Sequence, residues 1–199
     1  GAFEAIARVE ARFAECFGRA YTGPVEAVSC DDAEAVLVTL GSIAGLARES
    51  VARLREQGKR VGLLRIRYIR PFPAKLIAEA LAGAAAVGVL EKDISFGAEG
   101  TVFTNVNSAL QQAGCTTPTF NFIGGLGGDD ITSAQMDAMF DALLDSVGER
   151  GRDDAAAGRS CDDASTGQGA GLGRVSFLGI DFPAASQSAC GDDCEEGAR

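Results

Sequence analysis

Short apolar runs alternate along the chain with longer stretches in which apolar residues recur at every third or fourth position. A short apolar run is typical of a buried strand, and the three-to-four spacing is typical of an amphipathic helix. The expected strands are 36–40, 61–68, 86–90 and 119–123. The expected helices are 43–57, 73–82, 101–113 and 131–147. Alternating strands and helices with right-handed crossovers predict a three-layer α/β/α fold with a mainly parallel sheet.

Further elements are expected at the two ends of the chain. Apolar side chains on one face predict an amphipathic helix at 2–18, and an edge strand is expected at 25–30. We therefore predict one α/β domain over 1–147 that includes the N-terminal helix. After it we expect a flexible acidic segment, an added edge strand and a disordered acidic tail, at 148–173, 174–180 and 181–199 respectively.

Composition excludes several classes of function. A net charge of −10 and an isoelectric point near 4.5 disfavour nucleic acids and anionic membranes as partners. No run approaches the ~18 apolar residues of a membrane span, so we expect a cytoplasmic protein. The chain contains no histidine, which excludes Ser-His-Asp and Cys-His catalysis. Its six cysteines include no CxxC pair, and the CxxxC spacing of Cys190 and Cys194 has no second pair to complete a zinc site. We expect no catalytic residue and no bound metal.

Loops at the carboxyl ends of parallel strands are the usual working loops of such a sheet. In this chain they are 41–45, 67–72, 91–100 and 124–130. The last contains four glycines that are candidates for contact with a phosphate or coenzyme A, namely Gly124, Gly125, Gly127 and Gly128. Glycine brings backbone N–H groups close to a ligand, but we favour a tight corner against which another domain packs. Asp129 and Asp130 would repel an anion there, which favours the tight corner.

Two other loops are candidate interfaces. Arg67, Arg70 and Phe72 surround the Arg-Pro-Phe-Pro turn. Arginine there could pair with acidic groups on a neighbouring domain or with a ligand phosphate, or it could remain solvated. Phe96 and Glu99 belong to the 91–100 loop. Paired carboxylates in that loop could do acid–base work, but we favour charges at a helix N-terminus and contacts with another domain.

Four motifs, in order, carry a resemblance to a known family. They are CDDAEAVLVTLGS (30–42), VGLLRIRYIRPFP (61–73), VLEKDISFGAEG (89–100) and FIGGLGGDDIT (122–132). Together they resemble the alpha subunit of pyruvate:ferredoxin oxidoreductase and, more broadly, the 2-oxoacid:ferredoxin oxidoreductases. The similar part is their transketolase C-terminal-like domain, called domain II, over residues 3–144.

The resemblance implies a role in the oxidative decarboxylation of pyruvate to acetyl-CoA. In that family the cofactors are thiamine diphosphate with Mg²⁺ and iron–sulfur clusters, and the partners are pyrimidine-binding, pyrophosphate-binding and ferredoxin-type domains or subunits. This chain has neither a GDG segment nor a CxxCxxCxxxC run. The resemblance therefore implies a structural and assembly domain that binds no cofactor alone and is inactive alone.

Two alternatives remain open from the residues. A free-standing α/β module would bind coenzyme A or another phosphate ligand by itself. A C-terminal domain of a different thiamine enzyme would share the fold, although GGLGGDDIT fits the ferredoxin-linked family better.

Overall fold

The computed structural model describes residues 1–21, 23–156 and 175–178. The strands are β1 (Val25–Val28), β2 (Ala35–Leu40), β3 (Val61–Ile66), β4 (Ala86–Glu91), β5 (Thr119–Ile123) and β6 (Val175–Phe177). The helices are α1 (Ala2–Phe17), α2 (Ile43–Glu56), α3 (Ala74–Leu81), α4 (Thr101–Gln112), the short 3-10 helix η1 (Leu126–Gly128) and α5 (Ser133–Ala156).

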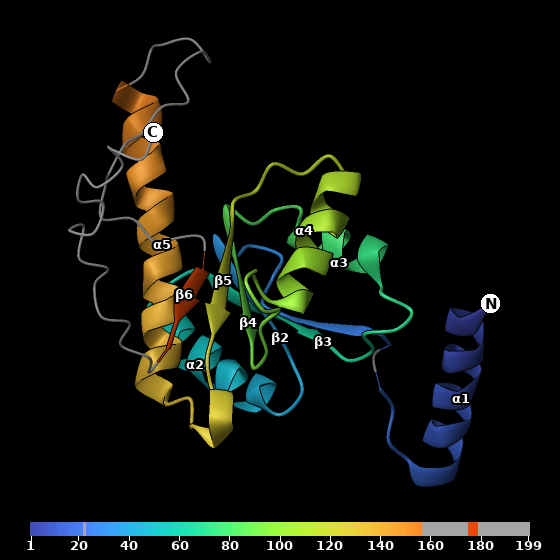
Figure 1. Ribbon diagram of the computed structural model, residues 1–199. Coiled ribbons are helices and arrows are strands. Elements are labelled where there is room, and N and C mark those ends of the chain that lie inside the picture. The colour runs from blue at the N-terminus through green and yellow to red at the C-terminus, as the bar shows by residue number, and fades with distance from the viewer. Residues whose placement is uncertain (22, 157–174, 179–199) are drawn as a thin grey trace, which may run out of the picture.

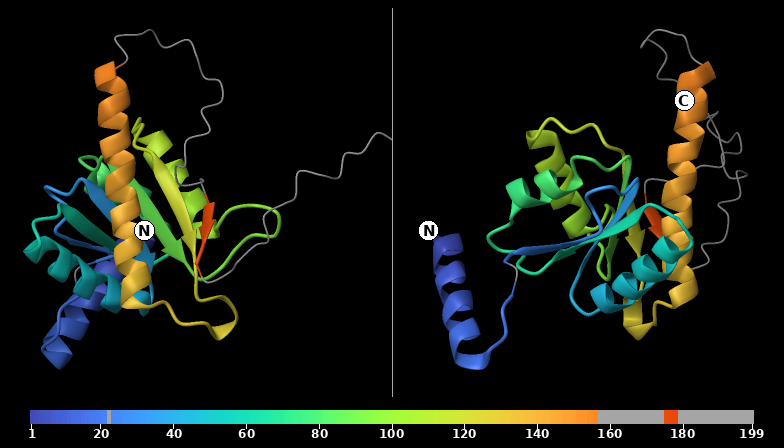
Figure 2. Two further views of the ribbon diagram at one scale, coloured as in Figure 1. Left: turned by 90° about the vertical axis from the view of Figure 1, so that its left-hand side faces the viewer. Right: turned by 180° about the vertical axis from the view of Figure 1, so that it is seen from behind.

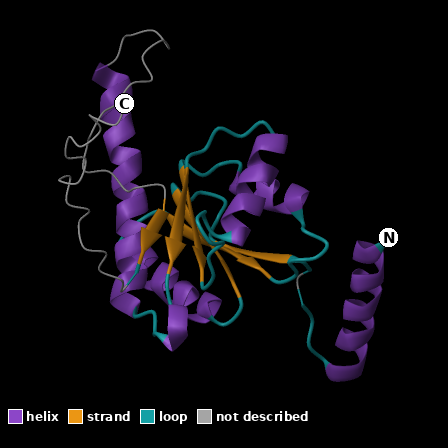
Figure 3. Ribbon diagram, in the orientation of Figure 1, coloured by secondary structure: helices purple, strands orange, loops and turns teal. Residues whose placement is uncertain are grey.

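These strands form a six-stranded sheet in the order β1-β3-β2-β4-β5-β6 (Figures 1 and 3). β2 to β6 run parallel, whereas β1 pairs antiparallel with β3 at one edge. Helices α3 and α4 cover one face, and α2 and α5 cover the other. The predicted three-layer fold with a mainly parallel sheet is confirmed.

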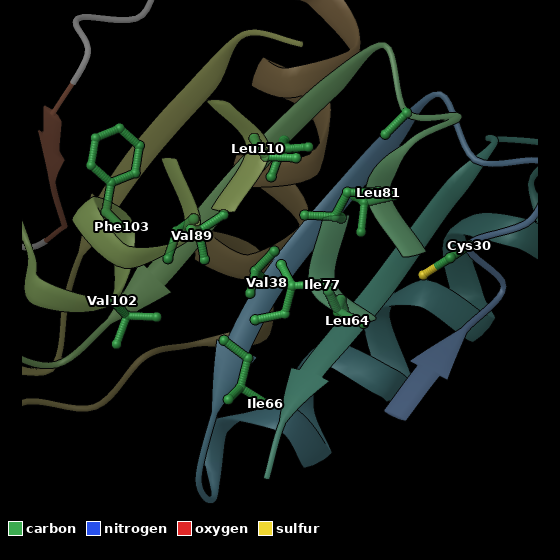
Figure 4. Close-up of a cluster of buried hydrophobic side chains, with 14 of the residues drawn as sticks. Cys30, Val38, Leu64, Ile66, Ile77, Leu81, Val89, Val102, Phe103 and Leu110 are labelled. Carbon is green, nitrogen blue, oxygen red and sulfur yellow. The ribbon is translucent and has the colours of Figure 1, made fainter. Parts of the chain in front are cut away.

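The apolar strand runs are explained by burial on both faces. Val36 and Val38 of β2 belong to the core beneath α3 and α4, part of which Figure 4 shows. Ala35 and Leu37, which alternate with them, belong to the core beneath α2 and α5. All four side chains are fully buried, as expected for the central strand of a covered parallel sheet.

Two predicted helix ends are confirmed in detail. Gly58, with φ of 83°, donates its N–H to the Arg55 carbonyl at 2.9 Å, and Lys59 donates to Leu54 at 3.1 Å. This is the Schellman ending of α2. At the start of α5, Thr132 N–H donates to Gln135 Oε1 at 2.8 Å, and Gln135 N–H donates to Thr132 Oγ1 at 3.2 Å. That pair is the predicted capping box.

Two boundaries differ from prediction. Pro73 is the N-cap of α3 rather than a residue of its first turn. Helix α5 continues to Ala156, beyond the expected end near Val147. Alanine, glutamate and arginine in this segment favour helix, and each of its two glycines, Gly148 and Gly151, costs only about 1 kcal/mol.

The two ends of the chain complete the description. A strand predicted within 174–180 corresponds to β6, which pairs in parallel with β5. The rest of the predicted flexible segment beyond Ala156 and the predicted tail at 181–199 lie outside the described residues. Within the described residues, no helix combines the length and apolar content required to cross a membrane.

Candidate functional site

The carboxyl ends of β2 and β4 lie side by side where the strand order reverses. β2 pairs with β3 on one side and with β4 on the other. The chain then leaves β2 toward α2 on one face and β4 toward α4 on the opposite face. This divergence opens a crevice where ligands bind in open α/β sheets. Here it is a cavity of about 250 Å³ lined by residues 40–43 and 90–93.

Glu91, the last residue of β4, is only 2% exposed. Its Oε2 accepts the Val102 N–H at 2.8 Å, and its Oε1 accepts the Phe103 N–H at 3.1 Å. Both donors belong to the first turn of α4, where backbone N–H groups have no partner within the helix. The carboxylate therefore caps α4, which confirms the interpretation of an acidic group at a helix N-terminus.

Asn121 of β5 extends this network. Its Nδ2 donates to Glu91 Oε1 at 2.9 Å and to the Val89 carbonyl at 3.2 Å. Its Oδ1 accepts the Gly100 N–H at 2.8 Å. A side chain at Gly100 would overlap the Glu91 carboxylate. The network thus fixes the start of α4 to β4 and β5.

The environment of Glu91 disfavours its charged form. Burial raises the pKa of Glu91 above the ordinary glutamate value, and the negative charge of Asp93 acts in the same direction. The N–H groups of Val102 and Phe103 and the Asn121 amide oppose this shift. The result is a buried carboxyl group that lines the crevice and also holds the first turn of α4 through two hydrogen bonds.

The glycine corner at 124–128 is explained in part by packing within this chain. A Cβ at Gly124 would lie 2.9 Å from Leu178 Cδ1, and one at Gly125 would overlap Lys92. Gly127 and Gly128 have φ values of 66° and 89° and open space where a side chain would be. The first pair permits close packing and the second pair permits the turn. Contact of this corner with a phosphate or coenzyme A stays a prediction.

The predicted interface residues of the 67–72 loop have different environments. The Arg67 guanidinium lies 4.4 Å from the centre of the Tyr21 ring. Arg70 is exposed, and its Nη1 donates to the Ile69 carbonyl at 2.7 Å. Phe72 is half-buried and packs against the core beneath α3 and α4. Part of the Phe72 ring is therefore buried within this chain, and the rest is open to solvent.

The second group lies after β4 and is separated from the first by β2. Phe96 is fully exposed. Glu99 is half-buried and accepts the Thr104 hydroxyl at 3.3 Å. Because β2 lies between β3 and β4, the structure does not bring the two predicted groups together at one point. Their role as interfaces stays a prediction.

Sequence reasoning missed the network and the crevice. Two signals pointed to the network: an asparagine inside the apolar run 119–123, and a glycine directly before the helix at 101. Nothing local pointed to the meeting of 40–43 with 90–93, which depends on the strand order.

Other parts of the described chain offer little chemistry. The larger cavity, about 510 Å³, lies between α3 and α4 and is lined mainly by alanines, away from the strand ends. No three His, Cys, Asp or Glu side chains gather to hold a metal ion among the residues that are placed. The described residues therefore provide packing surfaces, hydrogen bonds and an open crevice.

Comparison with known families decides the affiliation of this chain. The family model of the pyruvate:ferredoxin oxidoreductase core domain II matches residues 33–136. The chain belongs to this family. The matched segment contains β2 to β5 and the first turn of α5, and thus both the crevice and the network.

Curated relatives of this domain II chain are subunits of oxidoreductases. The pyruvate synthase subunit PorA of Methanothermobacter thermautotrophicus is 43% identical over 134 residues, which cover 67% of this chain and 34% of that relative. The ketoisovalerate oxidoreductase subunit VorA of Pyrococcus abyssi is 38% identical over 134 residues, with the same coverage. The match thus spans about a third of the length of these relatives.

Among solved structures, domain II is similar to part of the 2-oxoglutarate:ferredoxin oxidoreductase from Magnetococcus marinus. The TM-score is 0.47 at 17% identity, and the alignment covers 67% of this chain and 21% of that chain.

Proposed function

We propose that this chain is the domain II portion of a 2-oxoacid:ferredoxin oxidoreductase that converts pyruvate and coenzyme A to acetyl-CoA and CO₂ and passes the two electrons released to ferredoxin. The observation that carries the proposal is the family match across 33–136, which includes the crevice and the Glu91 network. Identities of 43% to a pyruvate synthase subunit and 38% to a ketoisovalerate oxidoreductase subunit support a 2-oxoacid as the substrate, and we propose pyruvate.

In this proposal the chain contributes structure and assembly rather than catalytic groups. It has no histidine, no GDG segment and no cysteine run of the iron–sulfur type. Thiamine diphosphate, Mg²⁺ and the iron–sulfur clusters are held by pyrimidine-binding, pyrophosphate-binding and ferredoxin-type domains or subunits of the same cytoplasmic enzyme. When bound there, thiamine diphosphate supplies the decarboxylation chemistry and the clusters carry the electrons.

The predicted interface residues then contact these neighbouring domains. Arg70 and Phe96 suit the role best, because both are exposed at the carboxyl edge of the sheet. Arg67 and Glu99 are half-buried at the same edge, and Phe72 contributes only the part of its ring outside the core.

The test is ferredoxin- or viologen-linked oxidation of pyruvate, with thiamine diphosphate, Mg²⁺ and coenzyme A present. The 199-residue chain is assayed alone and mixed with its parent subunits. We expect reduction of the dye only in the mixture. Turnover by the chain alone, or an active mixture from which the chain can be omitted without loss, contradicts the proposal.

A free-standing module that binds coenzyme A is the second candidate, and only the glycine corner favours it. Asp129 and Asp130 are both exposed beside that corner and oppose an anion. Titration calorimetry of the isolated chain with coenzyme A separates the two candidates. Saturable binding that is lost on Gly127→Asp would favour the free-standing module. If the chain is the domain II portion of the oxidoreductase, we expect no heat of binding from the isolated chain.

A further inference from the structure

Helix α1 presents an apolar face that the rest of the described chain covers only in part, since Ile6 and Phe13 on this face are half-buried. None of its residues is buried. Phe3, Val9 and Phe17 are 43%, 68% and 64% exposed, and Tyr21, just after the helix, is 47% exposed. Figure 1 and the right-hand view of Figure 2 show α1 apart from the sheet and from the other helices.

A helix whose apolar face is exposed to water is only marginally stable. Helices of 12–15 residues are marginal in isolation, and most of their stability comes from packing an apolar face. α1 has 16 residues, and its large apolar side chains recur at helical spacing, at positions 3, 6, 9, 13 and 17. Exposed apolar patches on otherwise soluble chains usually mark an interaction surface.

Polar contacts hold α1 beside the body and leave the side chains of Phe3, Val9 and Phe17 exposed. The Tyr68 hydroxyl donates to Glu10 Oε1 at 2.7 Å. Arg67 stacks on Tyr21, the last described residue before position 22. Between helix and body remains a cavity of about 300 Å³, lined by Ala5, Ile6, Val9, Glu10 and Tyr68. The contacts thus orient the apolar face at the same end of the molecule as the 67–72 loop.

The charges on the opposite side of α1 indicate whether a membrane or a protein covers the apolar face. That side carries two acidic and two basic residues, Glu4, Arg8, Arg12 and Glu15. A helix that lies on an anionic membrane has a polar face rich in lysine and arginine. The mixed signs on this side of α1, on a chain of net charge −10, fit a protein surface instead.

The length of the relatives indicates which protein surface covers the apolar face of α1. The family match begins at residue 33, after α1, and the match to the PorA relative leaves most of that subunit outside it. We propose that the apolar face of α1 docks on another domain of the same oxidoreductase, in an apolar groove that receives Phe3, Val9 and Phe17. The identity of this partner rests on the proposed function.

Charge insertion into the face tests the docking in the complex that contains the full chain. Val9→Glu and Phe17→Glu place a carboxylate in the face, while glutamate preserves helix propensity. Ala11→Glu, at an exposed position on the polar side, is the matched control. We expect the first two to weaken assembly at least about tenfold, measured by native mass spectrometry over a dilution series, and the control to remain within about twofold. Equal effects of all three variants overturn the proposal.

Cys16 provides a second readout that does not depend on turnover. Its thiol is exposed and lies seven residues after Val9, on the same side of the helix. We expect N-ethylmaleimide to label Cys16 rapidly in the isolated chain and about tenfold more slowly in the complex, by peptide-resolved mass spectrometry. Unchanged labelling in the complex overturns the docking.

Other occupants give different results. If a second copy covers α1, the isolated chain dimerises in light scattering and Val9→Glu abolishes the dimer. If a membrane covers it, the isolated chain sediments with anionic phospholipid vesicles and Phe17→Glu releases it. Either result overturns the proposed partner. Slow Cys16 labelling in a complex that does not oxidise pyruvate leaves the docking intact and rejects the proposed function alone.

Discussion

Gly100 has no room for a side chain, because the Glu91 carboxylate occupies the space where a Cβ would lie. Gly100→Ala should therefore displace either the carboxylate or the start of α4. Overpacking of this kind costs about 1–3 kcal/mol. Urea unfolding followed by circular dichroism measures the loss.

Gly45 supplies a control for which the same substitution should change the free energy of unfolding in the opposite direction. It is exposed within α2, and a Cβ there would meet nothing within 4 Å. Gly45→Ala should raise the free energy of unfolding by about 0.5–1 kcal/mol, since alanine restricts the unfolded chain. Equal destabilisation by both substitutions would show that the Gly100 effect is not specific to the Glu91 contact.

Glu91 should make the stability of the domain depend on pH. Its folded-state pKa is raised by burial, so the folded state binds more protons than the unfolded state above the ordinary glutamate pKa of about 4.3. The contribution of Glu91 is then largest below this value, falls as pH rises to the raised pKa, and is constant above it. Glu91→Gln should remove this fall from the profile of unfolding free energy against pH. Superimposable slopes for the two proteins would contradict the assignment.

Among the elements, α5 depends on its capping box. Thr132 Oγ1 accepts the Gln135 N–H at 3.2 Å, and alanine at position 132 has no side-chain oxygen to accept this hydrogen bond. Thr132→Ala should lower the free energy of unfolding by about 0.5–2 kcal/mol. Ser133→Ala, an exposed change one residue away, should stay within about 0.5 kcal/mol. Thermal and urea unfolding of the pair check this, and an equal loss in both would reject the capping role.

For the whole molecule, α1 should be dispensable for the stability of the α/β domain. None of its residues is buried, and a side-chain hydrogen bond from Tyr68 to Glu10 joins it to the body. Removal of residues 1–20 should therefore change the free energy of unfolding by less than about 1 kcal/mol. A larger loss in urea unfolding would mean that α1 packs on this domain, which would also weaken the docking proposal.

The amino-acid sequence by itself determined the alternation of elements, both helix ends at Gly58 and Thr132, and the family motifs. These features depend on neighbours within a few residues: the period of apolar positions, a positive φ, or a side chain that reaches its own helix terminus. The absence of histidine from these 199 residues likewise needs no structure.

Tertiary structure alone decided which distant residues meet. The order β3-β2-β4-β5 places 40–43 beside 90–93 and opens the crevice between them. It also brings Asn121 to Glu91, 30 positions away, so that one carboxylate caps a helix and anchors two strands. The hydrophobic pattern could assign α1 an apolar face but not reveal that this face is covered only in part. Periodicity defines which side of an element avoids water, whereas the crossover connections define what covers it.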